Sequence, residues 1–80
     1  MNNDKYKNYI YDLGMLFAEK ALDAKHNKDI SSKSDNYDYN IGYLMAFHEI
    51  IDIMKQQAKV FNINEKDIGL SGIDAESDLL

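Results

Sequence analysis

The sequence predicts an all-α protein in which two long helices form an antiparallel hairpin, followed by a short C-terminal helical segment. Three observations favour this fold. The 80-residue chain contains no proline, and hydrophobic residues make up 45% of it, a composition suited to long helices. Apolar residues recur every three or four positions in two long stretches, which a polar run separates. The two stretches also share a motif, YDLGMLFA from Tyr11 and YNIGYLMA from Tyr39.

The first helix is expected over about residues 4–25. Asn3 or Asp4 can cap its N-terminus, where a carboxylate also interacts favourably with the helix dipole. At 100° per residue this stretch presents two apolar stripes. The main stripe contains Tyr6, Ile10, Leu13, Phe17, Ala21 and Ala24. The second stripe contains Tyr11, Met15, Ala18 and Leu22.

A polar loop is expected over residues 26–36 and a second helix over about residues 37–61, with Asp35 or Asn36 as its cap. The broad apolar face of this helix is built on Tyr43, Phe47, Ile50, Met54 and Phe61. It is flanked on one side by Leu44, Ile51 and Ala58, and on the other by Tyr39, Ala46, Ile53 and Val60.

Residues 62–80 are predicted to form an acidic tail. Its run NINEKDIGLSG is typical of a single helical turn, with Asn64 as the cap and Gly69 as the stop. A last short helical stretch is expected at residues 74–79. The tail therefore has helical character without a third long helix.

The repeated motif predicts where the two long helices cross. Its register aligns Gly14 with Gly42 and Ala18 with Ala46, so each helix carries a G-x-x-x-A pattern. Small residues one turn apart let two backbones approach closely, and a glycine inside a helix costs ~1 kcal/mol relative to alanine unless packing uses the space. We therefore expect the two patterns to face each other. The alternative is that two amphipathic helices of similar composition match by chance.

A single domain of residues 1–80 has little interior, and the chain has no cysteine for a disulfide or a thiolate metal site. Two helices cannot bury apolar surface on three faces, so the main stripe of the first helix needs a further partner. Either the tail, with apolar residues between its acids, or a second copy of the chain can supply it. We expect both to contribute, with a homodimer completing a four-helix bundle.

The net charge of −5 is concentrated in the tail. Residues 1–61 carry eight lysines and nine acids, a net of −1, whereas residues 62–80 carry one lysine and five acids, a net of −4. The chain has no arginine, the side chain best suited to bidentate contacts with phosphates and bases. Direct nucleic-acid binding is therefore not expected, and the charge favours a protein partner with a basic surface.

No arrangement of residues indicates catalysis. His48 and Asp52 are one helical turn apart, but a stable metal site needs more than two ligands. The serines have no histidine at a suggestive spacing, and the four glycines form no phosphate-binding loop. The sequence therefore predicts a protein that is not an enzyme and that uses no metal and no cofactor.

The N-terminal residues MNNDKYKNYIYD lack the apolar core of a secretion signal. No stretch approaches the ~20 apolar residues that a membrane span needs. We expect a soluble, cytoplasmic protein that does not interact with membranes.

These features predict a small protein-binding protein, an inhibitor or immunity-type antagonist that occludes a basic site on a toxin, a nuclease or a phage-defence component. The predicted acidic patch contains Asp12, Glu19, Asp23, Asp74, Glu76 and Asp78. The predicted interface aromatics are Tyr9, Tyr11, Tyr39, Tyr43 and Phe47. Small acidic helical proteins of toxin–immunity pairs, and phage proteins that block host defences, resemble this chain in size, charge and predicted shape. The alternative is a homo-oligomeric structural or adaptor protein with no inhibitory role.

Overall fold

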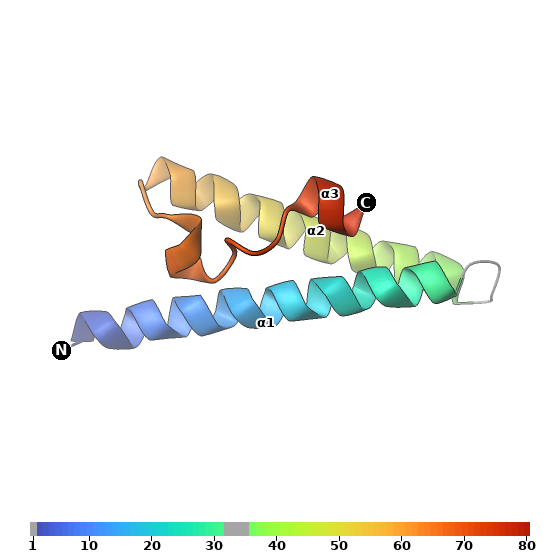
Figure 1. The fold of residues 1–80 in the computed structure, drawn as a ribbon, viewed down its shortest axis with the longest axis horizontal. Helices are drawn as coiled ribbons and strands as arrows, with labels where there is room; N and C mark the ends of the chain where they lie inside the picture. The colour runs from blue at the N-terminus through green and yellow to red at the C-terminus, as the bar shows by residue number, and fades with distance from the viewer. Residues whose placement is uncertain (1, 32–35) are drawn as a thin grey trace.

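Residues 2–31 and 36–80 are described by a computed structural model (Figure 1). Four helical elements follow one another along the chain: α1 (Asn2–Ile30), α2 (Tyr37–Val60), the 3-10 helix η1 (Glu65–Ile68) and α3 (Ala75–Leu79). α1 and α2 run antiparallel and pack together, and no strand occurs within the described ranges. The predicted all-α hairpin with a short C-terminal helix is confirmed. Its dimerisation remains a prediction.

α1 is longer than predicted. It continues to Ile30, so the expectation of a loop from residue 26 is wrong over residues 26–30. Asp29 stabilises the last turn, because its carboxylate lies 3.1 Å from Lys25 Nζ and 3.0 Å from Lys28 Nζ. Hydrogen bonds from Lys28 and Lys25 lower the pKa of Asp29, and the hydrogen bond to Asp29 raises the pKa of Lys28. The polar run continues the helix because its charges pair within one turn.

α2 ends at Val60 in a hydrogen-bonded turn of the Schellman type. Asn62 adopts a left-handed conformation, with φ 57°. The Ile63 amide donates to the Ala58 carbonyl at 2.7 Å, and the Asn62 amide donates to the Lys59 carbonyl at 3.2 Å. This pairing satisfies carbonyls that the helix end would leave free and turns the chain back toward α1.

A second turn of the same type ends η1 a few residues later. The Leu70 amide donates to the Glu65 carbonyl at 3.0 Å, and Gly69 adopts the left-handed conformation, with φ 73°. The prediction of one helical turn that stops at Gly69 is confirmed. Asn64 precedes this turn as predicted, although its side chain makes no capping hydrogen bond. Two left-handed turns thus place η1 between the splayed ends of α1 and α2 (Figure 1).

α3 owes its position to two aspartates. Asp74 caps the helix, because its Oδ1 accepts hydrogen bonds from the amides of Glu76 at 2.9 Å and Ser77 at 3.2 Å. Asp78 reaches back, and its Oδ2 accepts from the Asp74 amide at 2.8 Å. Such reciprocal capping fixes the N-terminus of a helix that is too short to be stable alone.

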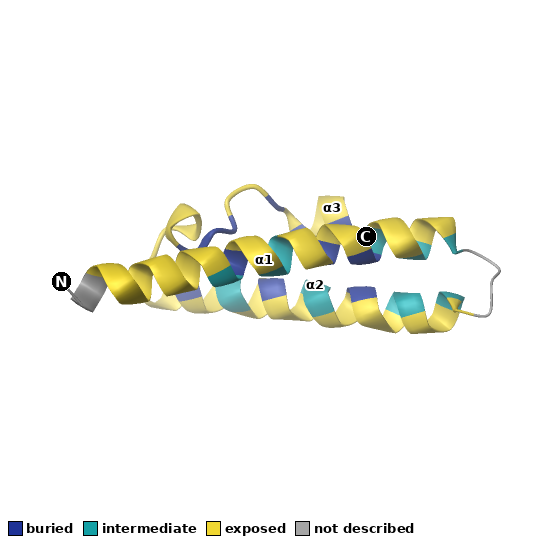
Figure 2. Ribbon diagram, turned by 90° about the horizontal axis from the view of Figure 1, so that it is seen from below, coloured by how far each residue is buried: buried dark blue, intermediate teal, exposed yellow. Residues whose placement is uncertain are grey.

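The buried core draws equally on the hairpin and on the C-terminal segment, defined as residues 62–80. Phe17 of α1 and Phe47 of α2 meet edge to face with ring centroids 6.2 Å apart, which joins the two long helices. Most of both helices is exposed on their remaining sides (Figure 2). The buried hydrophobic residues are Ala21, Ala24, Leu44, Ile51, Ala58, Ile68, Leu70, Ile73, Ala75 and Leu79. The C-terminal segment is therefore an integral part of the fold.

The buried side of α2 is rotated from the predicted one. The side predicted as a flank, Leu44, Ile51 and Ala58, is the most buried part of α2. Tyr43 and Ile50, predicted at the centre of the apolar face, are 41% and 37% exposed. Both sides of the helix are apolar, so hydrophobic spacing alone did not decide which side packs against α1.

The predicted helix crossing at the two glycines is wrong. A Cβ placed on Gly42 meets no atom within 4 Å, and Ala46 is exposed. Gly14 is buried, but a Cβ placed there overlaps the Ile68 carbonyl oxygen and lies 2.8 Å from its carbonyl carbon. The close partner of Gly14 is therefore the C-terminal segment. Gly42 faces solvent, because α2 turns its Leu44, Ile51 and Ala58 side toward the core.

The two stripes of α1 have the reverse of their predicted partners. The main stripe was expected to meet the tail or a second copy, and the side with Gly14 and Ala18 was expected to meet α2. The main stripe, represented by Phe17, Ala21 and Ala24, packs within the hairpin core. The second stripe borders the C-terminal segment, and a Cβ placed on Gly69 lies 2.8 Å from the Met15 amide nitrogen. The small residue at position 14 is needed because a turn of backbone, and not another helix, lies against it.

Candidate protein-binding surface

α2 carries an exposed series of uncharged residues with the alternating 4- and 3-residue spacing of a helix-packing seam. The exposed fractions include 68% for Tyr39, 51% for Ile53 and 70% for Val60. At 100° per residue, this series is turned about 180° away from His48 and Lys55, which contact the C-terminal segment. Its members are Tyr39, Tyr43, Ala46, Ile50, Ile53, Gln57 and Val60.

α1 carries a neighbouring series on the same side of the hairpin. Its N-terminal half is apolar and lies at the same end of the hairpin as the C-terminal half of α2, because the helices are antiparallel; η1 lies between the two helices there. Its C-terminal half is polar and lies beside Tyr39 and Tyr43, with which it lines a shallow hollow of about 330 Å³. The members of the α1 series are Tyr6, Tyr9, Leu13, Leu16, Lys20, Asp23 and Asn27. The two series together are called the hairpin face below.

Aromatic rings run along the hairpin face from the core to the surface. Phe47 packs against the core, and the Tyr43 ring centroid lies 5.2 Å from the Phe47 centroid. Tyr39 continues the contact, with its centroid 6.0 Å from that of Tyr43. Rings held by such contacts offer a large, ordered surface to a partner. Of the predicted interface aromatics, these three lie together, and Tyr9, which is 63% exposed, belongs to the same face.

Tyr11 lies elsewhere. It is 44% exposed and lines two hollows beside the C-terminal segment, one of which also contains Gly69. Its role as an interface residue remains a prediction, but it does not share a surface with Tyr39 and Tyr43. The five predicted aromatics are thus divided between two sides of the hairpin.

The predicted acidic patch is also divided. Asp12, Glu19 and Asp23 are exposed on α1, and none of them forms an ion pair with another residue of the described ranges. Asp12, Glu19 and Asp23 fall within about 40° of one another around the helix. They form a row of free carboxylates that borders the hairpin face at Asp23.

The acids of α3 are used within the fold. The carboxylates of Asp74 and Asp78 accept the capping hydrogen bonds of this helix. Glu76 Oε1 lies 3.5 Å from His48 Nε2, although the Glu76 side chain is 78% exposed. His48 itself is mostly buried, and its Nε2 has no hydrogen-bond partner among the described residues. Glu76 is therefore positioned over α2, away from the acids of α1.

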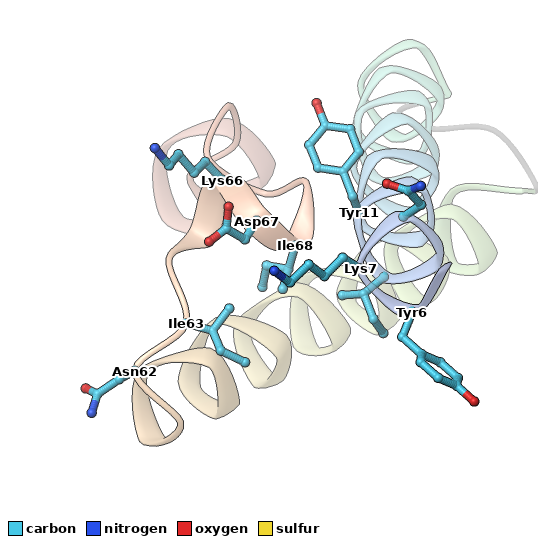
Figure 3. Close-up of a pocket in the computed structure, with 10 residues that line it drawn as sticks. Tyr6, Lys7, Tyr11, Asn62, Ile63, Lys66, Asp67 and Ile68 are labelled. Carbon is cyan, nitrogen blue, oxygen red and sulfur yellow. The ribbon is translucent and has the colours of Figure 1, made fainter. Parts of the chain in front are cut away.

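Sequence reasoning missed a hollow at the open end of the hairpin. It has a volume of about 770 Å³ and lies between the first turns of α1 and the segment around η1 (Figure 3). Ile63 and Ile68 point into it, Lys7 extends toward η1, and Tyr6 and Asn62 point away. The hollow results from the splay of the helices, which depends on η1 and which no local pattern indicates.

The described residues include no group of three or more histidines or acids placed to hold a metal ion. Within the same residues, no helix combines the length and the apolar character needed to span a membrane. A comparison of the chain with protein families, with curated proteins and with solved structures finds no match. The class of protein defined by the fold is an all-α hairpin closed by a docked C-terminal segment.

Proposed function

We propose that this protein acts by binding another protein and covering a basic surface on it, without catalysing a reaction. The observation that supports this proposal is the row of Asp12, Glu19 and Asp23. These carboxylates are exposed and form no ion pair with any residue that the structure describes, so their charge is available to a partner. An antagonist of a nuclease, a toxin or a phage-defence component would use such a row.

Charge and apolar contacts have separate parts in this mechanism. The free carboxylates attract a basic surface and raise the association rate, an effect that salt screens within a Debye length of ~8–10 Å. The aromatic rings beside Asp23 provide apolar anchors, which slow dissociation once the surfaces meet. The acids of α3 contribute to the overall negative potential, while their direct contacts hold α3 in place.

The proposal is tested with the full chain as bait in extracts of its native host, at low and at physiological salt. A variant with Asp12→Asn, Glu19→Gln and Asp23→Asn should lose most of the salt-sensitive binding. Its matched control changes Asp38→Asn, Glu49→Gln and Asp52→Asn, which removes the same charge from exposed positions of α2. Equal losses from both variants, or binding that salt leaves unchanged, would contradict occlusion of a basic surface.

A second function, that of a self-assembling structural or adaptor protein, is favoured by the uncharged series of α2. Partner-binding surfaces are depleted of charge at their centre, and this series contains no charged residue from Tyr39 to Val60. Assembly through it would form the four-helix bundle that two copies of a hairpin can build. The two functions share Asp23 and the tyrosines beside it, whereas Asp12 and Glu19 lie outside the uncharged series.

A further inference from the structure

We infer that a second copy of this chain covers the hairpin face, with the C-terminal segments of both copies on the outside. This inference rests on the second of the two functions proposed above, self-assembly, and assigns it a surface and an occupant. The C-terminal segment already occupies the opposite side of the hairpin, where it completes the core. The hairpin face has no covering element among the described residues (Figures 1 and 2).

The spacing of exposed residues indicates a helical occupant. The inner series of α2, Leu44 to Ala58, packs against α1 with alternating 3- and 4-residue steps. The outer series, Tyr39 to Val60, has the same alternation and no charge. A helix with two such series packs against two neighbours, as helices in four-helix bundles do.

The exposed area suits a dimer. Eight large side chains of the hairpin face are exposed by 37% to 70% each: Tyr6, Tyr9, Leu16, Tyr39, Tyr43, Ile50, Ile53 and Val60. A fully exposed side chain of this kind has an accessible area of ~150–200 Å². The eight side chains together therefore expose an area on the order of 700–900 Å². A stable interface of standard size buries about 800 Å² per partner. The face is therefore large enough to hold two copies together.

The charge of the face favours a copy of the same chain over a basic partner. The chain carries −5, so two copies repel each other unless they meet through a neutral surface. On the hairpin face the charges of Lys20 and Asp23 cancel, and all other members of the two series are uncharged. Asp12 and Glu19 lie off the two series, so a dimer leaves them free to meet another protein.

In a two-fold symmetric dimer both copies use the same face. A substitution on this face therefore acts on both sides of the interface, and a matched substitution elsewhere on α2 serves as its control. Ile53 of the hairpin face is 51% exposed, and Met45, on another side of the same helix, is 47% exposed. Ile53→Glu should raise the dimer dissociation constant at least about tenfold, because it places a charge in an apolar interface. Met45→Glu should leave this constant within about threefold.

Sedimentation equilibrium on the full chain measures these constants, with the 9.2 kDa monomer as reference mass. Circular dichroism confirms that each variant is folded, and Tyr39→Lys, at the far end of the face, serves where Ile53→Glu does not fold. A wild-type chain that stays monomeric up to millimolar concentration overturns the inference. So does a dimer that Met45→Glu weakens as much as the two face variants.

This test is separate from the test of partner occlusion. A monomeric wild type that still binds a partner in a salt-sensitive manner removes the second copy and leaves the antagonist proposal in place. If the chain dimerises but binds no other protein in a salt-sensitive manner, the adaptor function stands and the antagonist proposal fails.

Discussion

The two glycines of the repeated motif should respond in opposite ways to alanine. Gly42 is exposed inside α2, and an added Cβ meets nothing within 4 Å. Alanine is favoured over glycine in a helix by about 0.5–1 kcal/mol. Gly42→Ala should therefore raise the free energy of unfolding by this amount, and the melting temperature by about 2–8 °C for a domain of this size.

Gly14→Ala has the same gain in helix propensity but a larger cost. The new methyl group overlaps the carbonyl of Ile68, a backbone group that no side-chain rotation can move. Either α1 or the turn at η1 must shift, and overpacking of this kind costs about 1–3 kcal/mol. If the turn undocks, Ile68, Leu70 and Leu79 become exposed. Each would then lose about 1.5–3 kcal/mol of the stabilisation that its burial contributes. After the gain of about 0.5–1 kcal/mol in helix propensity is subtracted, we expect a net loss of up to about 2.5 kcal/mol if the turn stays docked, and a larger loss if it undocks.

Thermal and urea unfolding of the two variants beside wild type measures these changes. Amide hydrogen exchange over residues 68–73 shows whether the loss in Gly14→Ala comes from release of the C-terminal segment. The reasoning is refuted if Gly14→Ala is as stable as Gly42→Ala, because the segment would then not lie against α1 at this position. A large loss from Gly42→Ala would instead restore the predicted crossing of the two motifs.

Three further predictions concern the C-terminal segment and the end of α1. Leu79→Ala should cost about 2–5 kcal/mol in urea unfolding because Leu79 is fully buried, whereas Leu80→Ala, at a position 56% exposed, should change stability by less than about 0.5 kcal/mol. Asp74→Ala should lose the α3 cap and about 0.5–2 kcal/mol, with faster exchange confined to α3 and the residues just before it. The pKa of Asp29 is lowered from its ordinary value of 3.8 by hydrogen bonds from Lys28 and Lys25, so its small contribution is present above that value and is lost as the pH falls through the folded-state pKa. Asp29→Asn should therefore speed exchange in the last turn of α1 at neutral pH and make no difference once the pH is well below the folded-state pKa. A difference that persists in such acid would show that the carboxylate acts by another means.

The inferred dimer would cover Tyr39 and Tyr43, so a basic partner would meet the dimer through its exposed acids alone. Two copies joined through their hairpin faces would present two rows of Asp12 and Glu19 on the outside. A partner with two basic sites would then bind both rows, and linking the sites would raise the apparent affinity. Asp23 lines the hollow beside Tyr39, at the border of the hairpin face, and is therefore the acid most affected by dimerisation.

The sequence by itself determined the elements of this protein. Helical spacing, the absence of proline and the polar run between two apolar stretches predicted α1 and α2, with the end of α1 placed too early. Gly69 predicted the turn, because a left-handed turn depends on a single residue and its immediate neighbours. The last helix was expected at residues 74–79, but its capping by Asp74 was not predicted. The exposed acids of α1 were also predictable, since charge belongs to the residue itself.

Only the tertiary structure decided which surfaces meet. Gly14 and Gly42 occupy equal positions in the repeat, yet one lies against the backbone at Ile68 and the other faces solvent. Each long helix has more apolar surface than one neighbour can bury, so periodicity identified several possible contacts without ranking them. Two left-handed turns bring the C-terminal segment onto α1, where the Ile68 carbonyl lies against Gly14. Which surfaces pack together depends on residues that are distant in the chain, so a local sequence pattern cannot predict it.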